Sequence, residues 1–188
     1  GAIDVHAIAA RDTAYLPQGA EIDRSFPIHV YDLVSMGLWR RSGLFGGIGA
    51  RDRARIEAAI SAVGLEGFEA RPIGTLSGGQ MQRTLFARLL LQDARVILLD
   101  EPFNALDAAT VADLIALVGR WHLEGRTVLA VLHDFELVRQ RFPQTLLLAR
   151  GPIAWGPTSE ALAPENLLKA RRMGEAWQED AASCPQAA

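Results

Sequence analysis

Residues 96–102 read Val-Ile-Leu-Leu-Asp-Glu-Pro, an apolar run that ends in two adjacent carboxylates. The β-favouring run predicts a strand that is buried on both faces, as in a parallel sheet. Asp100 and Glu101 are then expected at the carboxyl edge of the sheet, where α/β proteins bind ligands. In phosphoryl-transfer enzymes the first such carboxylate holds magnesium, and a neighbouring acid orients or deprotonates a water. Taken alone, the pattern also fits a buried strand followed by a solvated acidic turn.

Helical and strand-like patterns alternate after this strand. The expected order is a helix over residues 108–124, a buried strand over 127–132, a helix over 134–141 and a strand over 145–149. This alternation predicts a parallel sheet with right-handed crossovers. Farther on, residues 153–155 are expected to form an edge hairpin and residues 165–172 a last helix. Residues after Gln178 are expected to be disordered.

The residues before the strand are mainly helical in pattern. Short strands are expected at residues 2–5 and 13–16. Apolar residues then recur at helical spacing over residues 29–39 and 51–63, and a third helix is expected to begin near Ser77. The predicted fold class is therefore α/β, with a parallel-sheet core interrupted by an inserted α-helical subdomain.

Composition excludes several classes of protein. The chain has 188 residues, 49% hydrophobic and 22% charged, which is typical of a soluble globular domain. Its longest apolar runs fall far short of the ~20 residues of a membrane-spanning helix. A net charge of −3 argues against a nucleic-acid partner. Cys184 is the only cysteine, which excludes an internal disulfide framework and fits a reducing compartment such as the cytosol.

Residues 76–80 read Leu-Ser-Gly-Gly-Gln and carry the second chemical signal. Ser77 is a good helix N-cap, and Gln80 occupies the capping-box position. Gly78 and Gly79 let the backbone approach phosphate oxygens closely, and the free amides of a helix start attract anions. A plain capped helix is the alternative, but it does not require two first-turn glycines that cost about 1 kcal/mol each relative to alanine.

Two further stretches follow the carboxylate pair. Residues 104–107 read Asn-Ala-Leu-Asp, and His133 follows the strand expected at 127–132. A lone histidine at a strand end is more often structural than catalytic. Its expected place at the same sheet edge as Asp100 and Glu101 favours a functional role.

In this order and spacing, these motifs resemble the ATP-binding cassette (ABC) family. Residues 76–80 resemble its signature motif, residues 96–100 its Walker B strand, and residues 104–107 its D-loop, with asparagine where serine is common. The resemblance implies that Glu101 is the catalytic glutamate and His133 the switch histidine. It also implies that Gln18, in Tyr-Leu-Pro-Gln, is the Q-loop glutamine.

The family resemblance also implies a domain organisation. Residues 1–26 would be the remnant of the N-terminal core strands with the Q-loop, and residues 27–92 the helical subdomain that ends in the signature helix. Residues 93–178 would form the α/β core with Walker B, D-loop and switch histidine, and residues 179–188 a disordered tail. The core would be of the P-loop NTPase type.

The resemblance implies ATP and Mg²⁺ as ligands. Asp100 would hold Mg²⁺ through water, Glu101 would polarise the attacking water, and His133 would contact the γ-phosphate. Gln18 would sense Mg²⁺ and nucleotide and pass closure to the membrane subunit. Two copies would associate head to tail, so that Ser77, Gly78, Gly79 and Gln80 bind the nucleotide held by the partner. Asp107 would couple the two sites.

Residues 20–28, followed by Met36-Gly37, are similar to ATPase subunits of zinc or manganese importers. This implies a transmembrane permease partner and a cytoplasmic location at the inner face of the cell membrane. The four histidines show no metal-ligand spacing, as expected if other subunits handle the metal. Two alternatives are a non-transport cassette ATPase acting on nucleic acid or ribosomes, which the acidic balance disfavours, and a non-catalytic module that modulates a complete partner cassette.

The family's P-loop, G-x-x-x-x-G-K-[ST], is not found in the sequence. Lys169 is the only lysine and has no such context. We therefore expect that the chain starts after the P-loop helix, without the first core strand, and is inactive alone. Exposed core surface would then lower its stability or cause aggregation.

Overall fold

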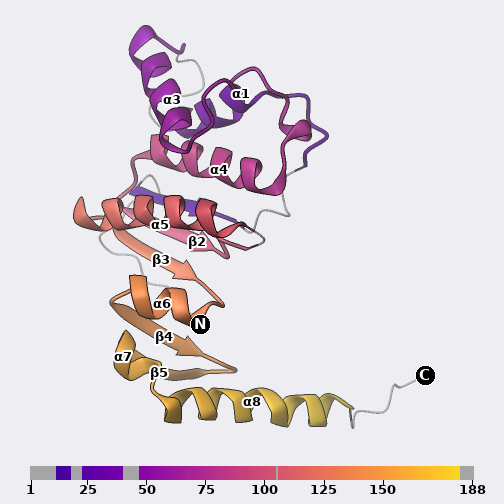
Figure 1. The fold of residues 1–188 in the computed structure, drawn as a ribbon, viewed down its shortest axis with the longest axis vertical. Coiled ribbons are helices and arrows are strands. Elements are labelled where there is room, and N and C mark those ends of the chain that lie inside the picture. The colour runs from indigo at the N-terminus through magenta and orange to yellow at the C-terminus, as the bar shows by residue number, and fades with distance from the viewer. Residues whose placement is uncertain (1–11, 18–22, 40–46, 105, 183–188) are drawn as a thin grey trace. The chain divides into compact units, whose positions relative to one another are not determined.

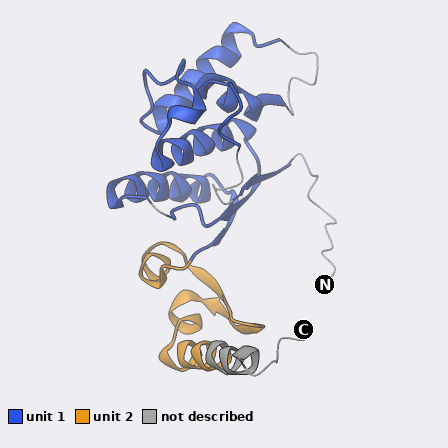
Figure 2. Cartoon of the chain, turned by 90° about the vertical axis from the view of Figure 1, so that its right-hand side faces the viewer, with its two compact units in different colours: residues 1–132 blue, residues 133–188 orange. Residues whose placement is uncertain are grey.

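The computed structural model describes residues 12–17, 23–39, 47–104 and 106–182, with side chains described as far as Met173. The chain divides into two compact units, residues 1–132 and 133–188 (Figure 2). The predicted strand at residues 2–5 and the predicted Q-loop residue Gln18 lie outside the described residues. No helix in the described ranges is both long and apolar enough to cross a bilayer.

A three-stranded parallel sheet forms the centre of the first unit. Its strands are β1 (Thr13–Leu16), β2 (Val96–Asp100) and β3 (Thr127–Val131), in the order β1-β2-β3. The register pairs Leu16 with Leu99 and Leu99 with Ala130, so the three carboxyl ends lie at one edge. These strands confirm the predicted α/β class with a parallel sheet.

The expectation of fully buried strands at residues 96–99 and 127–132 is wrong, because burial alternates along both β2 and β3. Ala14, Leu16, Ile97 and Leu99 point to the buried face. On the opposite face the side chains of Tyr15, Leu129 and Val131 are 51%, 65% and 52% exposed. The asymmetry arises because the helices in contact with the strands pack against the buried face.

Periodicity predicts the helices of the first unit except the short 3₁₀ helix at Ile73–Thr75, which falls in an expected connection. They are α1 (Val30–Ser35), the short 3₁₀ helices η3 (Met36–Leu38) and η4 (Ile73–Thr75), α3 (Ala50–Ala62), α4 (Gly78–Gln92) and α5 (Ala108–Leu123). The single helix expected over residues 29–39 is divided between α1 and η3. Helix α4 lies between the pair α1 and α3 and the sheet (Figure 1), and it also contacts α5. Phe86 of α4 stacks on Trp121 of α5, with 6.1 Å between ring centroids.

The second unit contains α6 (Phe135–Arg141), β4 (Gln144–Leu148), β5 (Pro152–Pro157), α7 (Thr158–Ala161) and α8 (Pro164–Ala182). The strand expected at residues 145–149 is β4, but its described partner is β5, in antiparallel pairing. The short connection over residues 149–151 favours this hairpin over the parallel pairing that the sequence predicts. A hairpin at the residues expected near 153–155 is thus confirmed, but it forms a two-stranded sheet of its own. Helix α8 is longer than predicted, and it includes residues 179–182 of the expected disordered tail.

Candidate functional site

The start of α4 has the predicted capping box. The Gln80 backbone amide donates to Ser77 Oγ (3.2 Å), and the Ser77 amide donates to Gln80 Oε1 (3.0 Å). The reciprocal pair satisfies two backbone donors at the helix end and fixes where the helix begins. A Cβ placed on Gly78 would meet no heavy atom within 4 Å, so the first turn is sterically open at this residue. An open helix start of this kind can accept an anion.

Asp100 is the last residue of β2, at the carboxyl edge of the parallel sheet. Its Oδ2 accepts a hydrogen bond from the Tyr15 hydroxyl on the neighbouring strand β1, across 3.2 Å. A carboxylate has about four lone-pair sites, so this bond leaves capacity to hold a magnesium-bound water. One carboxylate combined with substrate phosphates is the usual protein environment of Mg²⁺. The residue therefore fits its expected role. Elsewhere, no group of three or more His, Cys, Asp or Glu among the described residues is arranged for a metal ion.

Glu101 has an unusual backbone, with φ at +44°. Its amide donates to the Val131 carbonyl of β3 (3.2 Å), which extends the strand pairing by one residue. Its side-chain Oε2 accepts a hydrogen bond from the Asn104 amide (3.2 Å). A positive φ at a non-glycine residue is uncommon and costs conformational energy, and such residues are concentrated at functional sites.

The D-loop-like segment ends at Asp107, which is the N-cap of α5. Its Oδ1 accepts from the Thr110 amide (2.9 Å), and its Oδ2 accepts from the Thr110 hydroxyl (2.7 Å). These bonds, the backbone one first, hold the pKa of the Asp107 carboxyl below its ordinary value of 3.8. Asp107 is thus ionised at neutral pH and is held by the first turn of its own helix.

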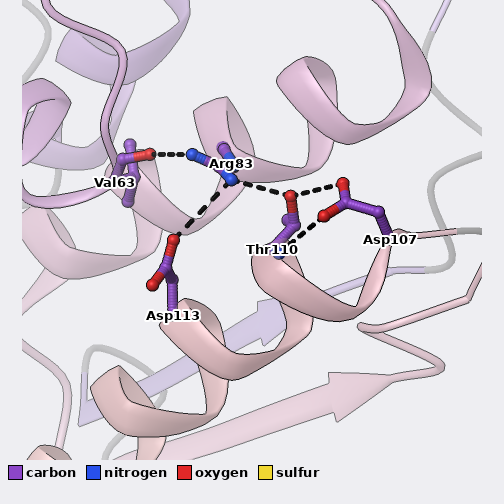
Figure 3. A network of polar contacts seen from close by, with 5 residues as sticks. All are labelled: Val63, Arg83, Asp107, Thr110 and Asp113. Atoms are coloured by element: carbon purple, nitrogen blue, oxygen red, sulfur yellow. Dashed lines mark hydrogen bonds and ion pairs between the residues drawn. The ribbon is translucent and has the colours of Figure 1, made fainter.

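An arginine from α4 reaches the same threonine (Figure 3). Arg83 donates through Nη2 to Thr110 Oγ1 (2.7 Å) and through Nη1 to the Val63 carbonyl (3.2 Å). Its Nη2 also lies 3.7 Å from Oδ2 of Asp113, whose side chain is 74% exposed. Arg83, Thr110 and Tyr15 were not among the site residues predicted from the sequence, and only the position of Arg83 just after the signature-like motif indicates a role for it.

The structure brings some of the predicted site residues together. A Cβ placed on Gly79 would lie 3.6 Å from Leu106 Cδ2. The D-loop-like segment therefore lies beside the first turn of α4. Asp100 and Glu101 lie at the end of β2 in the same unit. His133 begins the second unit, so its approach to Glu101 stays a prediction. The role of Gln18 stays a prediction as well.

Comparison with known proteins decides the family. The sequence profile of the family described as ABC transporter matches residues 4–104, which include the Ser77 cap, Asp100 and Glu101. This chain belongs to the ABC transporter family.

Relatives in this ABC family include transport proteins for two metals. The manganese transport system ATP-binding protein MntB of Halalkalibacterium halodurans is 36% identical over 168 residues, which cover 89% of this chain and 67% of the relative. The zinc transport system ATP-binding protein TroB of Treponema pallidum is 40% identical over 160 residues, which cover 85% of this chain and 60% of the relative. The chain therefore spans about two thirds or less of the length of these relatives.

Solved structures of ABC proteins share the fold. An ABC transporter described as metal-chelate type, in an inward-facing conformation, matches with a TM-score of 0.77 and 29% identity, over 86% of this chain and 64% of the other. CbiO1 of Clostridium perfringens, part of the ABC transporter complex CbiONQ, matches with a TM-score of 0.65 and 25% identity. That alignment covers 89% of this chain and 68% of the other.

Proposed function

We propose that this chain is the ATP-hydrolysing, nucleotide-binding subunit of an ABC importer for manganese or zinc ions. The observation that carries the proposal is the pairing, in one unit, of an open, capped helix start at Ser77 with the Asp100–Glu101 carboxylates and the Asp107 segment. The choice of metal rests on the relatives named as manganese and zinc transport proteins. The finer description of the fold, a P-loop-NTPase-type core with an inserted helical subdomain, belongs to the same proposal.

The proposed chemistry divides between two copies of the chain. Asp100 binds Mg²⁺ through water, and Glu101 orients and polarises the attacking water. His133 contacts the γ-phosphate, and Gln18 links Mg²⁺ to the permease. Ser77, Gly78, Gly79 and Gln80 of the facing copy bind the same nucleotide through the start of α4. Mg²⁺, when bound, neutralises charge that develops on the phosphate oxygens.

The proposed assembly is a head-to-tail pair of these subunits on a transmembrane permease, at the cytoplasmic face of the membrane, without nucleic acid. We also propose that a P-loop segment is required for activity, because residues 1–188 contain no G-x-x-x-x-G-K-[ST] sequence.

ATP binding tests the site assignment. Magnesium-ATP binding is measured for the 188-residue chain and for a version carrying the P-loop segment of a manganese-importer relative at its N-terminus. Binding and hydrolysis are expected only in the extended version. Tight ATP binding by the 188 residues alone would contradict the need for a P-loop.

Turnover and metal uptake test the function. In the extended version, Glu101→Gln is expected to leave ATP binding intact and nearly abolish turnover, because the amide cannot act as a base. His133→Ala is expected to lower hydrolysis far more than nucleotide affinity. In cells that express the chain with its permease, uptake of radioactive manganese or zinc should stop with Glu101→Gln. Near-normal turnover in that variant would remove Glu101 from the catalytic role, and uptake of neither metal would reject the proposed substrate.

A further inference from the structure

We propose that one face of α4 is a support that positions Glu101 and Asp107 relative to each other, with Gln82 and Arg83 as its positioning residues. This supporting face consists of Gly79, Gln82, Arg83 and Phe86. Their spacing of i, i+3, i+4 and i+7 places them along one side of the helix. The inference rests on the proposed function, because it concerns the segment between the proposed catalytic glutamate and the D-loop aspartate.

Gln82 holds the beginning of that segment. Its side-chain Nε2 donates to the carbonyl oxygen of Pro102 across 2.9 Å, and the residue is only 7% exposed. Pro102 directly follows Glu101, so this buried bond restrains the peptide next to the glutamate. A buried amide that lost this acceptor would be left unsatisfied, which makes the contact costly to break.

Arg83 holds the end of the segment through Thr110. The direction of each bond is determined by chemistry, because arginine can only donate and a carboxylate can only accept. Arg83 Nη2 therefore donates to Thr110 Oγ1, and the Thr110 hydroxyl gives its own proton to Asp107 Oδ2 (2.7 Å for each bond). The guanidinium is itself anchored on the Val63 carbonyl, the residue that follows α3. A rotation of the Asp107 carboxylate would thus break a chain of bonds that leads back to α4.

Two apolar contacts fill the space between these polar ends. Phe103 stacks on Phe86 with 6.3 Å between ring centroids and 20° between ring planes. Leu106 lies beside Gly79. Each residue of the supporting face therefore contacts the 102–107 segment or its anchor. The segment is held near both of its ends, at Pro102 and Phe103 and at Leu106 and Asp107, so the spacing between Glu101 and Asp107 depends on α4.

Substitutions at Thr110 test the role of its hydroxyl, because they can remove the hydroxyl bond to Asp107 and keep the backbone bond. Thr110→Val removes the hydroxyl relay but keeps the backbone amide that caps α5 through Asp107 Oδ1. Thr110→Ser keeps the hydroxyl. Gln82→Met keeps the side-chain length and removes the amide donor. Asp113→Asn is the control, since Asp113 is mostly exposed and touches Arg83 only at 3.7 Å.

The variants are compared in the extended version, which carries the P-loop segment, for kcat, KM for ATP and melting temperature. Thr110→Val and Gln82→Met should each lower kcat roughly tenfold, because misplacing a catalytic group by about 1 Å can cost as much as a hundredfold. KM should change less than about twofold, since the change lies away from the nucleotide contacts. Thr110→Ser should restore most of kcat, and Asp113→Asn should match the wild type.

Hydrogen exchange tests the inference without nucleotide. Amides of residues 103–108 should exchange roughly fivefold faster in Thr110→Val and Gln82→Met, as expected for the loss of one hydrogen bond. Wild-type exchange in both variants, unchanged kcat in both, or an equal loss of kcat in Asp113→Asn would overturn the inference. An extended version without substitutions that showed no ATP turnover would instead reject the proposed function, and the exchange rates would still decide whether α4 holds the segment.

Discussion

The Asn104 side-chain amide donates a hydrogen bond to the Glu101 carboxylate, with 3.2 Å between Nδ2 and Oε2. The Asn104 backbone amide also donates to the Glu101 carbonyl (3.2 Å), so the two residues close a turn on themselves. Asn104 lies in the segment that we propose as the D-loop, at the residue where the resemblance to the ABC family leads us to expect serine. In this chain that substitution supplies an amide long enough to orient the proposed catalytic carboxylate.

Asn104→Ala should therefore lower ATP turnover about threefold, the size of effect expected for one lost hydrogen bond. The change frees the Glu101 side chain to adopt other rotamers, while ATP binding stays at the wild-type level. Steady-state ATPase assays of the extended version, which carries the P-loop segment, give the measurement. Asn166→Ala is a matched control, because that amide donates to the Glu160 carbonyl in the second unit. Equal turnover in the two variants would show that the Asn104 contact does not orient Glu101.

The positive φ of Glu101 leads to a prediction about stability. At this residue glycine should be more stable than alanine by about 1 kcal/mol, because glycine adopts a φ of +44° without steric cost. Both substitutions remove the carboxylate, so the difference between their free energies of unfolding reports the cost of the backbone conformation alone. At Ala112, an exposed position inside α5, glycine should instead be less stable than alanine by about 1 kcal/mol. Urea unfolding of Glu101→Gly, Glu101→Ala and Ala112→Gly measures both differences, and the same sign at both sites would mean that Glu101 is unstrained.

The absence of a side chain at Gly37 allows η3 to pack closely against α4. A Cβ on Gly37 would collide with the Arg88 carbonyl oxygen and lie 2.8 Å from Leu91 Cβ. Gly37→Ala should thus destabilise the protein by about 1–3 kcal/mol, the usual cost of overpacking. Gly119 lies within α5, and a Cβ there would meet nothing within 4 Å. Gly119→Ala should therefore stabilise by about 0.5–1 kcal/mol. Thermal unfolding of both variants is the measurement, and an unchanged melting temperature for Gly37→Ala would rule out the close approach.

Asp107 should make stability depend on acid pH. Hydrogen bonds from the Thr110 amide and hydroxyl lower its pKa in the folded state below the ordinary value of 3.8. The carboxylate then contributes stability that is fully present above pH 3.8 and is lost as the pH falls through the folded-state value. Asp23 and Glu66 also have pKa values lowered by serine hydrogen bonds, so the wild type carries several such contributions.

The measurement is the melting temperature of wild type and Asp107→Asn over a series of acid pH values. Asparagine is a good N-cap that does not titrate, so the variant keeps the start of α5. The advantage of the wild type should shrink as the pH is lowered below 3.8. A constant difference over the whole series would show that the Thr110 bonds do not favour the charged carboxylate.

The exposed face of the parallel sheet should promote self-association of the 188-residue chain. Leu129 and Val131 are both more than half exposed on β3, and contiguous apolar surface of this kind drives aggregation. Replacing Leu129 and Val131 by threonine lowers the apolar area of this face, and threonine still favours a β-strand. Light scattering should show less aggregate in the double variant. A sharp, cooperative thermal transition of a monomeric wild-type chain would contradict this prediction.

The sequence by itself determined the features that depend on near neighbours. The capping box joins Ser77 to Gln80, three residues away, and Asp107 caps α5 through Thr110 at the same spacing. The β2 and β3 strands, their parallel pairing and the α3 and α5 helices followed from hydrophobic periodicity and alternation. Such patterns can be recognised in the sequence because each helix or strand has an apolar face of its own.

Only the tertiary structure decided the contacts that position the site. The bond from Gln82 to Pro102 spans 20 residues and the bond from Arg83 to Thr110 spans 27, so neither is implied by local spacing. The prediction was also wrong about the burial of the sheet, which is one-sided, and about the partner of β4, which is antiparallel. Both features depend on which helices and strands pack against each other in the folded chain. Local hydrogen bonds and propensity act within about four residues along a helix, whereas the placement of α4 against the 102–107 segment comes from packing between distant parts of the chain.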